Sequence, residues 1–242
     1  MTERDRFLGT MRYQDVDRRP LHLVGPWADT LERWYGEGLP RGRDVHEYLG
    51  VTSLRTANLC GISGIHPPYT TRTIEETATY RISLDEYGRK VRTFKNHTSM
   101  PEWIEFPVKT AEDLRRLLDE HFDVEHMDER FPPEWLPRVQ KAAAGDAVNV
   151  IDGGCYYWTL RSVAGVDGAA YLLYVAPDLV DELFERYFTV VMEGMRRAYR
   201  FARIDVVGFG EDIAFKTGPL MSPAMFRRFI LPRYAKIQDI AA

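Results

Sequence analysis

The sequence predicts an α/β fold in which short parallel strands alternate with amphipathic helices. Three apolar segments have the length of buried strands: LHLV at 21–24, AVNVI at 147–151 and IDVVGFG at 204–210. Each is followed by a turn and then by a helical pattern, the repeating unit of a parallel sheet covered by helices. The 242 residues are 45% hydrophobic and 28% charged, so the chain is long and apolar enough to bury a core.

The first unit opens with a short helix. Apolar residues at helical spacing in ERDRFLGTM predict that helix, and Pro20 ends the pattern just before the strand at 21–24. Gly25 and Pro26 predict a turn, and ADTLERWYGEG predicts a second helix with one apolar side.

A long insertion separates the first strand from the second. Residues 73–107 contain two β-rich arms around an Asp-Glu-Tyr-Gly turn, which predicts a β-hairpin excursion outside the main sheet. Helices are expected at about 110–120, where Thr110 and Asp113 form a capping-box pattern, and at about 133–143.

The second and third units complete the pattern. The strand at 147–151 leads into Asp-Gly-Gly-Cys and an aromatic helix start, and a long amphipathic helix after Pro177 leads to the strand at 204–210. A polar loop and a helix capped by Ser222, with Pro223 at its first position, follow. Three such units would leave the last strand with an unpaired edge or would require a partner chain, so we expect the chain to be incomplete.

The composition limits the classes of molecule that the protein is expected to bind. The formal charge is −4 and basic residues are interleaved with acidic ones, which argues against nucleic acid or an anionic membrane. The polar start and the lack of an apolar run of roughly 20 residues predict a cytoplasmic protein with no membrane partner. Cys60 and Cys155 match no zinc or disulfide spacing.

The segment GFGEDIAFKTGPLMSPAMFRRFILPRYAKI closely resembles a region of the uroporphyrinogen decarboxylase family. In that region an acidic pair at a strand end precedes a spaced motif, carried here by Gly218, Pro219, Ser222, Pro223, Phe226, Phe229, Leu231, Pro232 and Tyr234. RRPLHLVGPWADTLERWYGEGLP and VNVIDGGCYYWTLRSVAG are similar to two further regions of the family, so the resemblance spans most of the chain.

The resemblance implies a (β/α)8 TIM barrel, of which residues 1–242 would be the N-terminal two-thirds of a single domain, and one of two chemistries. The family's true decarboxylases carry an arginine-rich stretch of the form RPPVWxMRQAGR, whereas this chain reads RPLHLVGPWADTLERW. A substrate with eight carboxylates needs those cations. The resemblance therefore favours methyl transfer from a methylated corrinoid to a thiol or another small acceptor, with uroporphyrinogen decarboxylation and a non-catalytic barrel as alternatives.

The family's methyltransferases bind zinc through a His-x-Cys and a distant Cys. In this interpretation those ligands lie beyond residue 242, so no metal ligands are expected within the chain. The implied partners are a small-molecule substrate and a corrinoid protein, and a homodimer is left open.

In a barrel of this type the reactive groups lie at the carboxyl ends of the strands. The candidate catalytic residues are therefore Asp212, which is preferred, its neighbour Glu211, and Asp152. Asp152 is followed by two glycines and is either a substrate contact or an ordinary turn residue. One of the two adjacent carboxylates, Glu211 or Asp212, would turn away to cap a helix or pair with an arginine.

The candidate substrate-binding residues are Lys216, Trp27, Arg33 and Tyr156. Lys216 either binds an anionic substrate group or neutralises Glu211. The aromatic side chains, with those of residues 157 and 158, either wall a pocket for a planar ring or belong to the core. Cys155 is either a reactive thiolate near a helix start or an inert small hydrophobe.

Overall fold

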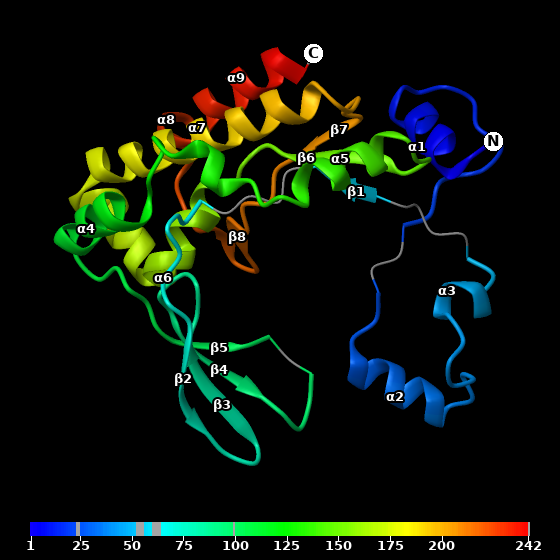
Figure 1. The fold of residues 1–242 in the computed structure, drawn as a ribbon, viewed down its shortest axis with the longest axis horizontal. Helices are drawn as coiled ribbons and strands as arrows, with labels where there is room; N and C mark the ends of the chain where they lie inside the picture. Colours follow the sequence, from blue (N-terminus) through cyan, green and yellow to red (C-terminus); the bar gives the residue numbers. More distant parts are fainter. Residues whose placement is uncertain (23–24, 52–55, 60–63, 99, 242) are drawn as a thin grey trace.

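The protein is described from a computed structural model that covers residues 1–22, 25–51, 56–59, 64–98 and 100–241 (Figure 1). Its centre is a parallel sheet in the order β1-β6-β7, formed by Thr56–Asn58, Val148–Asp152 and Val206–Gly208. The predicted α/β class with a parallel sheet is therefore confirmed.

The first strand of this sheet is not the one predicted. Leu21 and His22 lie in no strand, and residues 23 and 24 lie outside the described ranges. β1 instead pairs with β6 in register from Thr56 opposite Val148 to Asn58 opposite Val150. Its sequence is short and largely polar, so apolar patterning gave no signal for it.

Helices α6 (Tyr156–Val175) and α7 (Pro177–Tyr199) together supply about half of the buried residues of the core. α6 bends at Gly165, whose positive φ of 72° leaves room for the ring of Phe106. Helices α4 (Ala111–His121) and α5 (Trp135–Ala143) lie near the two predicted ranges. At the start of α4 the predicted capping box is confirmed, because Thr110 accepts from the Asp113 amide at 3.2 Å and Asp113 accepts from the Thr110 amide at 3.1 Å.

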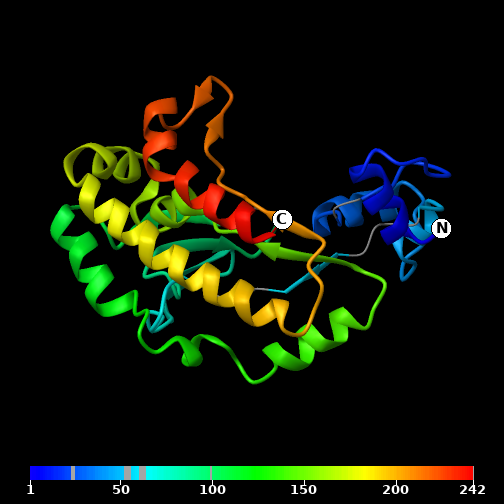
Figure 2. The same cartoon turned by 90° about the horizontal axis from the view of Figure 1, so that it is seen from above.

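The C-terminal segment returns to α7. It contains the short pair β8 (Ala214–Phe215) and β9 (Gly218–Pro219), then α8 (Pro223–Phe229) and α9 (Leu231–Ala241). Ser222 caps α8, as predicted, by accepting a hydrogen bond from the Met225 amide at 3.2 Å. α9 runs alongside α7 (Figure 2), where the buried Arg233 donates to Asp181 at 3.0 Å and to Glu185 at 2.9 Å.

Residues 72–105 form a four-stranded antiparallel sheet that extends away from the parallel sheet (Figure 1). Its strands, in the order β2-β3-β4-β5, are Arg72–Glu76, Tyr80–Leu84, Lys90–Phe94 and Glu102–Glu105. The Asp-Glu-Tyr-Gly turn joins β3 to β4, and Asp85 organises it by accepting hydrogen bonds from two backbone amides. The excursion therefore has four strands, two more than a single hairpin.

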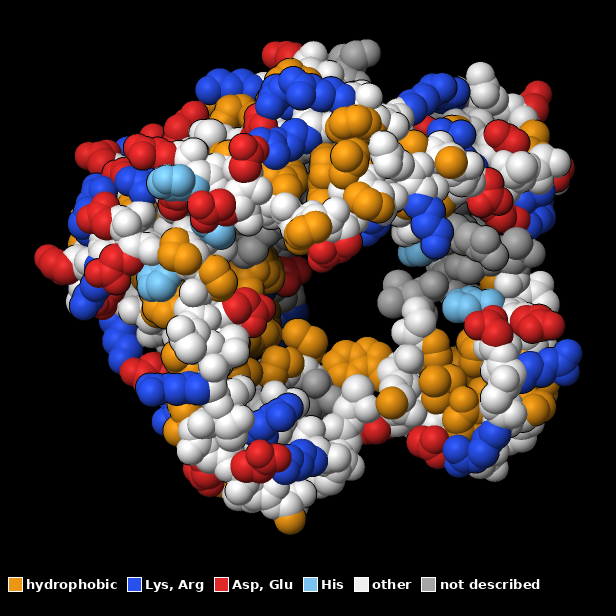
Figure 3. Space-filling model, viewed as in Figure 1, with side chains coloured by type: hydrophobic (Ala, Val, Ile, Leu, Met, Phe, Trp, Pro, Cys, Tyr) orange, Lys and Arg blue, Asp and Glu red, His pale blue; other side chains and the backbone are white. Residues whose placement is uncertain are grey.

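The N-terminal helices differ in how closely they lie to the parallel sheet. α1 (Glu3–Met11) is tied to the parallel sheet by the ion pair of Arg4 with Asp205 at 2.7 Å. α2 (Ala28–Gly36) buries no residue, and an opening separates α2 and α3 (Val45–Tyr48) from the parallel sheet (Figure 3). The remaining element is the 3-10 helix η1 at Met127–Arg130.

Within the described ranges, no single helix is both long and apolar enough to cross a membrane. α6 and α7 meet that test only when taken together, as a pair bent by 112°.

Candidate functional site

The loops that follow β6 and β7 meet at the carboxyl end of the sheet. The Gly153 amide donates to the Gly208 carbonyl at 2.8 Å, which joins the two loops. A Cβ atom at Gly153 would lie 2.5 Å from the Phe209 ring, so only glycine allows this approach. The strand ends thereby place Asp152, Cys155 and Glu211 next to one another.

Glu211 is buried, with 7% of its surface exposed, and its carboxylate caps the N-terminus of α6. Its carboxylate accepts hydrogen bonds from the backbone amides of Tyr156 at 2.9 Å and Tyr157 at 2.7 Å, and from the Tyr234 hydroxyl at 2.6 Å. A further contact to the Trp158 amide is 3.3 Å. Burial raises the pKa of Glu211, and the hydrogen bonds from the hydroxyl and the amides partly oppose that rise. Glu211 thus joins α6 to α9.

Tyr156 belongs to the core. Its ring centroid lies 5.8 Å from that of Phe184 and 5.6 Å from that of Tyr187, and its side chain is fully buried. Its hydroxyl has no hydrogen-bond partner within the described structure. Burial raises the pKa of this phenol, so the group stays neutral.

A cavity of about 310 Å³ lies beside these loops. Its lining comprises Gly64, Ile65, Tyr87, Asp152, Cys155, Trp158, Thr159, Val163, Tyr187 and Gly210. Asp152 is the only carboxylate among them, and its Oδ1 accepts from the Gly154 amide at 2.8 Å while lying 3.7 Å from the Cys155 sulfur. Burial, reinforced by the Asp152 charge, raises the pKa of the Cys155 thiol to about 12. Cys155 is therefore a neutral thiol at physiological pH.

Asp212 and Lys216 lie on the exposed side of the same loop. Asp212 has a positive φ of 48°, its side chain is 67% exposed, and it accepts from Arg161 Nη2 at 2.7 Å. Lys216 is exposed in the turn between β8 and β9. Of the two adjacent acids, Glu211 caps a helix and Asp212 pairs with an arginine.

Trp27 and Arg33 are not brought to these loops. Trp27 precedes α2 and is 46% exposed, and Arg33 lies within α2, 3.8 Å from Glu37. That helix lies apart from the carboxyl ends of β6 and β7 (Figure 1). The structure therefore gathers Asp152, Glu211 and Tyr156 from the sequence-predicted set.

Of the three aromatic residues that line the cavity, Trp158 was among the aromatic side chains considered as pocket walls, whereas Tyr87 and Tyr187 were not predicted. Trp158 belongs to the aromatic run that follows Asp152, so its position near the strand end is visible in the sequence. Tyr87 comes from the β3–β4 turn and Tyr187 from the middle of α7, so no local pattern relates them to the strand ends.

No group of three or more His, Cys, Asp and Glu side chains that could hold a metal ion occurs in the part of the chain that the structure describes. The described residues therefore offer no set of ligands for a zinc ion.

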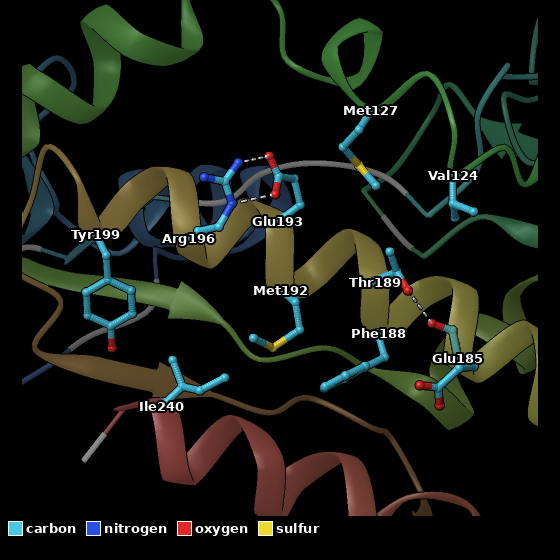
Figure 4. Close-up of a pocket in the computed structure, with 10 residues that line it drawn as sticks. All are labelled: Val124, Met127, Glu185, Phe188, Thr189, Met192, Glu193, Arg196, Tyr199 and Ile240. Carbon is cyan, nitrogen blue, oxygen red and sulfur yellow. Dashed lines mark hydrogen bonds and ion pairs between the residues drawn. The ribbon is translucent and has the colours of Figure 1, made fainter.

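A larger groove of about 840 Å³ lies along α7 (Figure 4). Phe188 and Met192 provide apolar surface, with Met127 and Ile240 on neighbouring segments. Its charged groups are already paired: Glu193 binds Arg196 at 2.6 Å, and Glu185 binds Arg233. Chemistry that needs an available polar group therefore favours the smaller cavity.

Comparison of the chain with protein-family models, with curated proteins and with solved structures found no match.

Proposed function

We propose that this protein is an enzyme of the uroporphyrinogen decarboxylase type that transfers a methyl group from a methylated corrinoid to a thiol or another small acceptor. The observation that supports it most is the 2.6 Å hydrogen bond from Tyr234 to Glu211. Tyr234 belongs to the segment that resembles the family, and Glu211 holds the start of α6, whose first turns line the cavity. The resembling segment thus helps to build the cavity wall.

Asp152 is the residue proposed to orient the acceptor. Its carboxylate lines the cavity and can accept a hydrogen bond from the S–H or N–H of a small molecule placed there. A cavity of about 310 Å³ holds such an acceptor, while the corrinoid protein would present its methyl group from outside. In the transfer, the acceptor lone pair forms a bond to the methyl carbon as the carbon–cobalt bond breaks, its electron pair stays on cobalt, and the acceptor proton passes to solvent or to Asp152.

Decarboxylation of uroporphyrinogen is the less favoured chemistry. Among the described residues that line the cavity there is no Lys or Arg, and the one charged residue is an acid. Placing unpaired substrate carboxylates beside it costs several kcal/mol for each.

The test is a methyl-transfer assay with methylcobalamin and three small thiols: cysteamine, 2-mercaptoethanol and 3-mercaptopropionate. We expect loss of methylcobalamin absorbance together with the matching thioether by mass spectrometry, in reactions with and without added zinc. Asp152→Ala should lower the rate at least tenfold, while Asp178→Asn, which removes a 98% exposed charge, should not.

A folded protein that forms no thioether in any arm contradicts the proposal. Formation of coproporphyrinogen from uroporphyrinogen would instead assign the decarboxylase chemistry. A folded chain with neither activity would leave the non-catalytic barrel.

A further inference from the structure

The cavity combines aromatic rings with a single acid. Tyr87 and Trp158 meet edge to face, with ring centroids 6.0 Å apart and planes at 90°, and Tyr187 is only 8% exposed. These three rings come from the β3–β4 turn, α6 and α7. Asp152 adds the carboxylate.

That carboxylate has no cationic partner among the described residues. Two arginines lie near the aromatic wall: the guanidinium carbon of Arg89 is 4.5 Å from the centroid of the Tyr87 ring, and Arg161 lines a neighbouring pocket together with Trp158. Arg89 binds Asp85 at 2.8 Å, and Arg161 binds Asp212 at 2.7 Å. Within the described part of the chain, no ion pair therefore balances the negative charge of Asp152.

The start of α6 offers no binding site for an anion either. Its first three amides, at residues 156–158, all donate to Glu211. A helix N-terminus attracts anions through free N–H groups, and here those groups are occupied. The raised pKa of Cys155, caused by burial and by Asp152, is consistent with a site that disfavours negative charge.

We propose that this cavity binds a small organic cation, an amine or methylated ammonium group, with Asp152 as its counter-ion and the rings of Tyr87, Trp158 and Tyr187 around the charge. Aromatic faces attract ammonium groups, and the attraction grows as the site is desolvated. The cavity volume is at the lower end of ordinary ligand sites, which suits a molecule of this size. The inference deepens the proposed function, because it assigns an amine-bearing acceptor to that same site.

Binding can be measured without any methyl donor, so its outcome is separate from that of the methyl-transfer assay. The probes share one shape and differ in charge: choline, 3,3-dimethylbutan-1-ol and 3,3-dimethylbutanoate. Isothermal titration calorimetry at fixed ionic strength gives Kd for each. We expect choline to bind at least tenfold more tightly than the neutral alcohol, which corresponds to about 1.4 kcal/mol, and the carboxylate to bind most weakly.

Two variants assign the effect to the named groups. Asp152→Asn keeps an oxygen that can accept from the Gly154 amide but removes the charge, so choline and the alcohol should bind equally. Trp158→Leu should weaken choline binding, and Trp158→Phe should restore part of it. Asp178→Asn removes an exposed charge on α7 and should leave all three Kd values unchanged.

Equal binding of choline and the alcohol by the wild-type protein overturns the inference, as does tighter binding of the carboxylate or binding of none of the three. Methyl transfer to 2-mercaptoethanol in the absence of choline binding would overturn the inference while leaving the proposed function in place.

Discussion

The hydrogen bonds of Glu211 allow one stability prediction to be worked out in full. Glu211→Ala removes the acceptor of two α6 amides and of the Tyr234 hydroxyl, at 2.9, 2.7 and 2.6 Å. Each buried donor left without a partner costs about 1–3 kcal/mol. Burial of the carboxylate is itself unfavourable, as its raised pKa indicates, and the substitution relieves that part.

We therefore expect the free energy of unfolding to fall by about 3 kcal/mol. With an m-value of about 3 kcal/mol/M, the urea midpoint should fall by about 1 M. Equilibrium denaturation followed by circular dichroism measures this, with Glu37→Ala, at a 58% exposed glutamate just after α2, as the matched control. A Glu211→Ala midpoint within about 0.2 M of wild type would refute the idea that this carboxylate holds α6 and α9 together.

Three further predictions follow from the same structure. Because the pKa of folded Glu211 is raised, its contribution to stability is fully present below the unfolded pKa of about 4.3 and is lost as pH rises through the folded value. The difference in unfolding free energy between wild type and Glu211→Gln should therefore shrink or reverse as pH rises from 4 to about 8, measured by urea denaturation. Gly153→Ala places a methyl group 2.5 Å from the Phe209 ring, so we expect a loss of about 1–3 kcal/mol and a lower melting temperature. Thr110→Ala removes the cap of α4 and should cost about 1 kcal/mol by denaturation.

Each of these predictions has a clear contrary outcome. A pH-independent difference for Glu211→Gln would contradict the raised pKa. An unchanged melting temperature for Gly153→Ala would show that the loops after β6 and β7 separate easily. Thr110→Ser keeps the capping oxygen and serves as the control for Thr110→Ala, so equal losses from both would argue against the cap.

Local sequence signals predicted the elements whose determinants are themselves local. The capping residues Thr110 and Ser222 marked the starts of α4 and α8, and the apolar runs marked β6 and β7. β1 was missed because its three residues carry almost no apolar pattern and form a strand only through pairing with β6. A parallel pair brings together segments far apart in sequence, which single-sequence patterning does not detect.

In the candidate site too, features with local determinants were predicted and those that depend on the fold were not. The position rule for strand ends selected Asp152 and Glu211, and the structure places both at the meeting point of the two loops. Their different surroundings depend on side-chain direction: Glu211 turns inward to the start of α6, and Asp212 turns outward to Arg161. Tyr87 joins the cavity from the antiparallel excursion, which no spacing in the sequence indicates.

The bond between Tyr234 and Glu211 has a mechanical consequence. Tyr234 on α9 and Tyr156 in the first turn of α6 both donate hydrogen bonds to the carboxylate of Glu211. Any ligand that pulls α9 away from α7 must either break that bond or drag the beginning of α6, and with it the Trp158 side of the cavity. We therefore expect a change at the surface of α9 to reach the cavity through the carboxylate of Glu211.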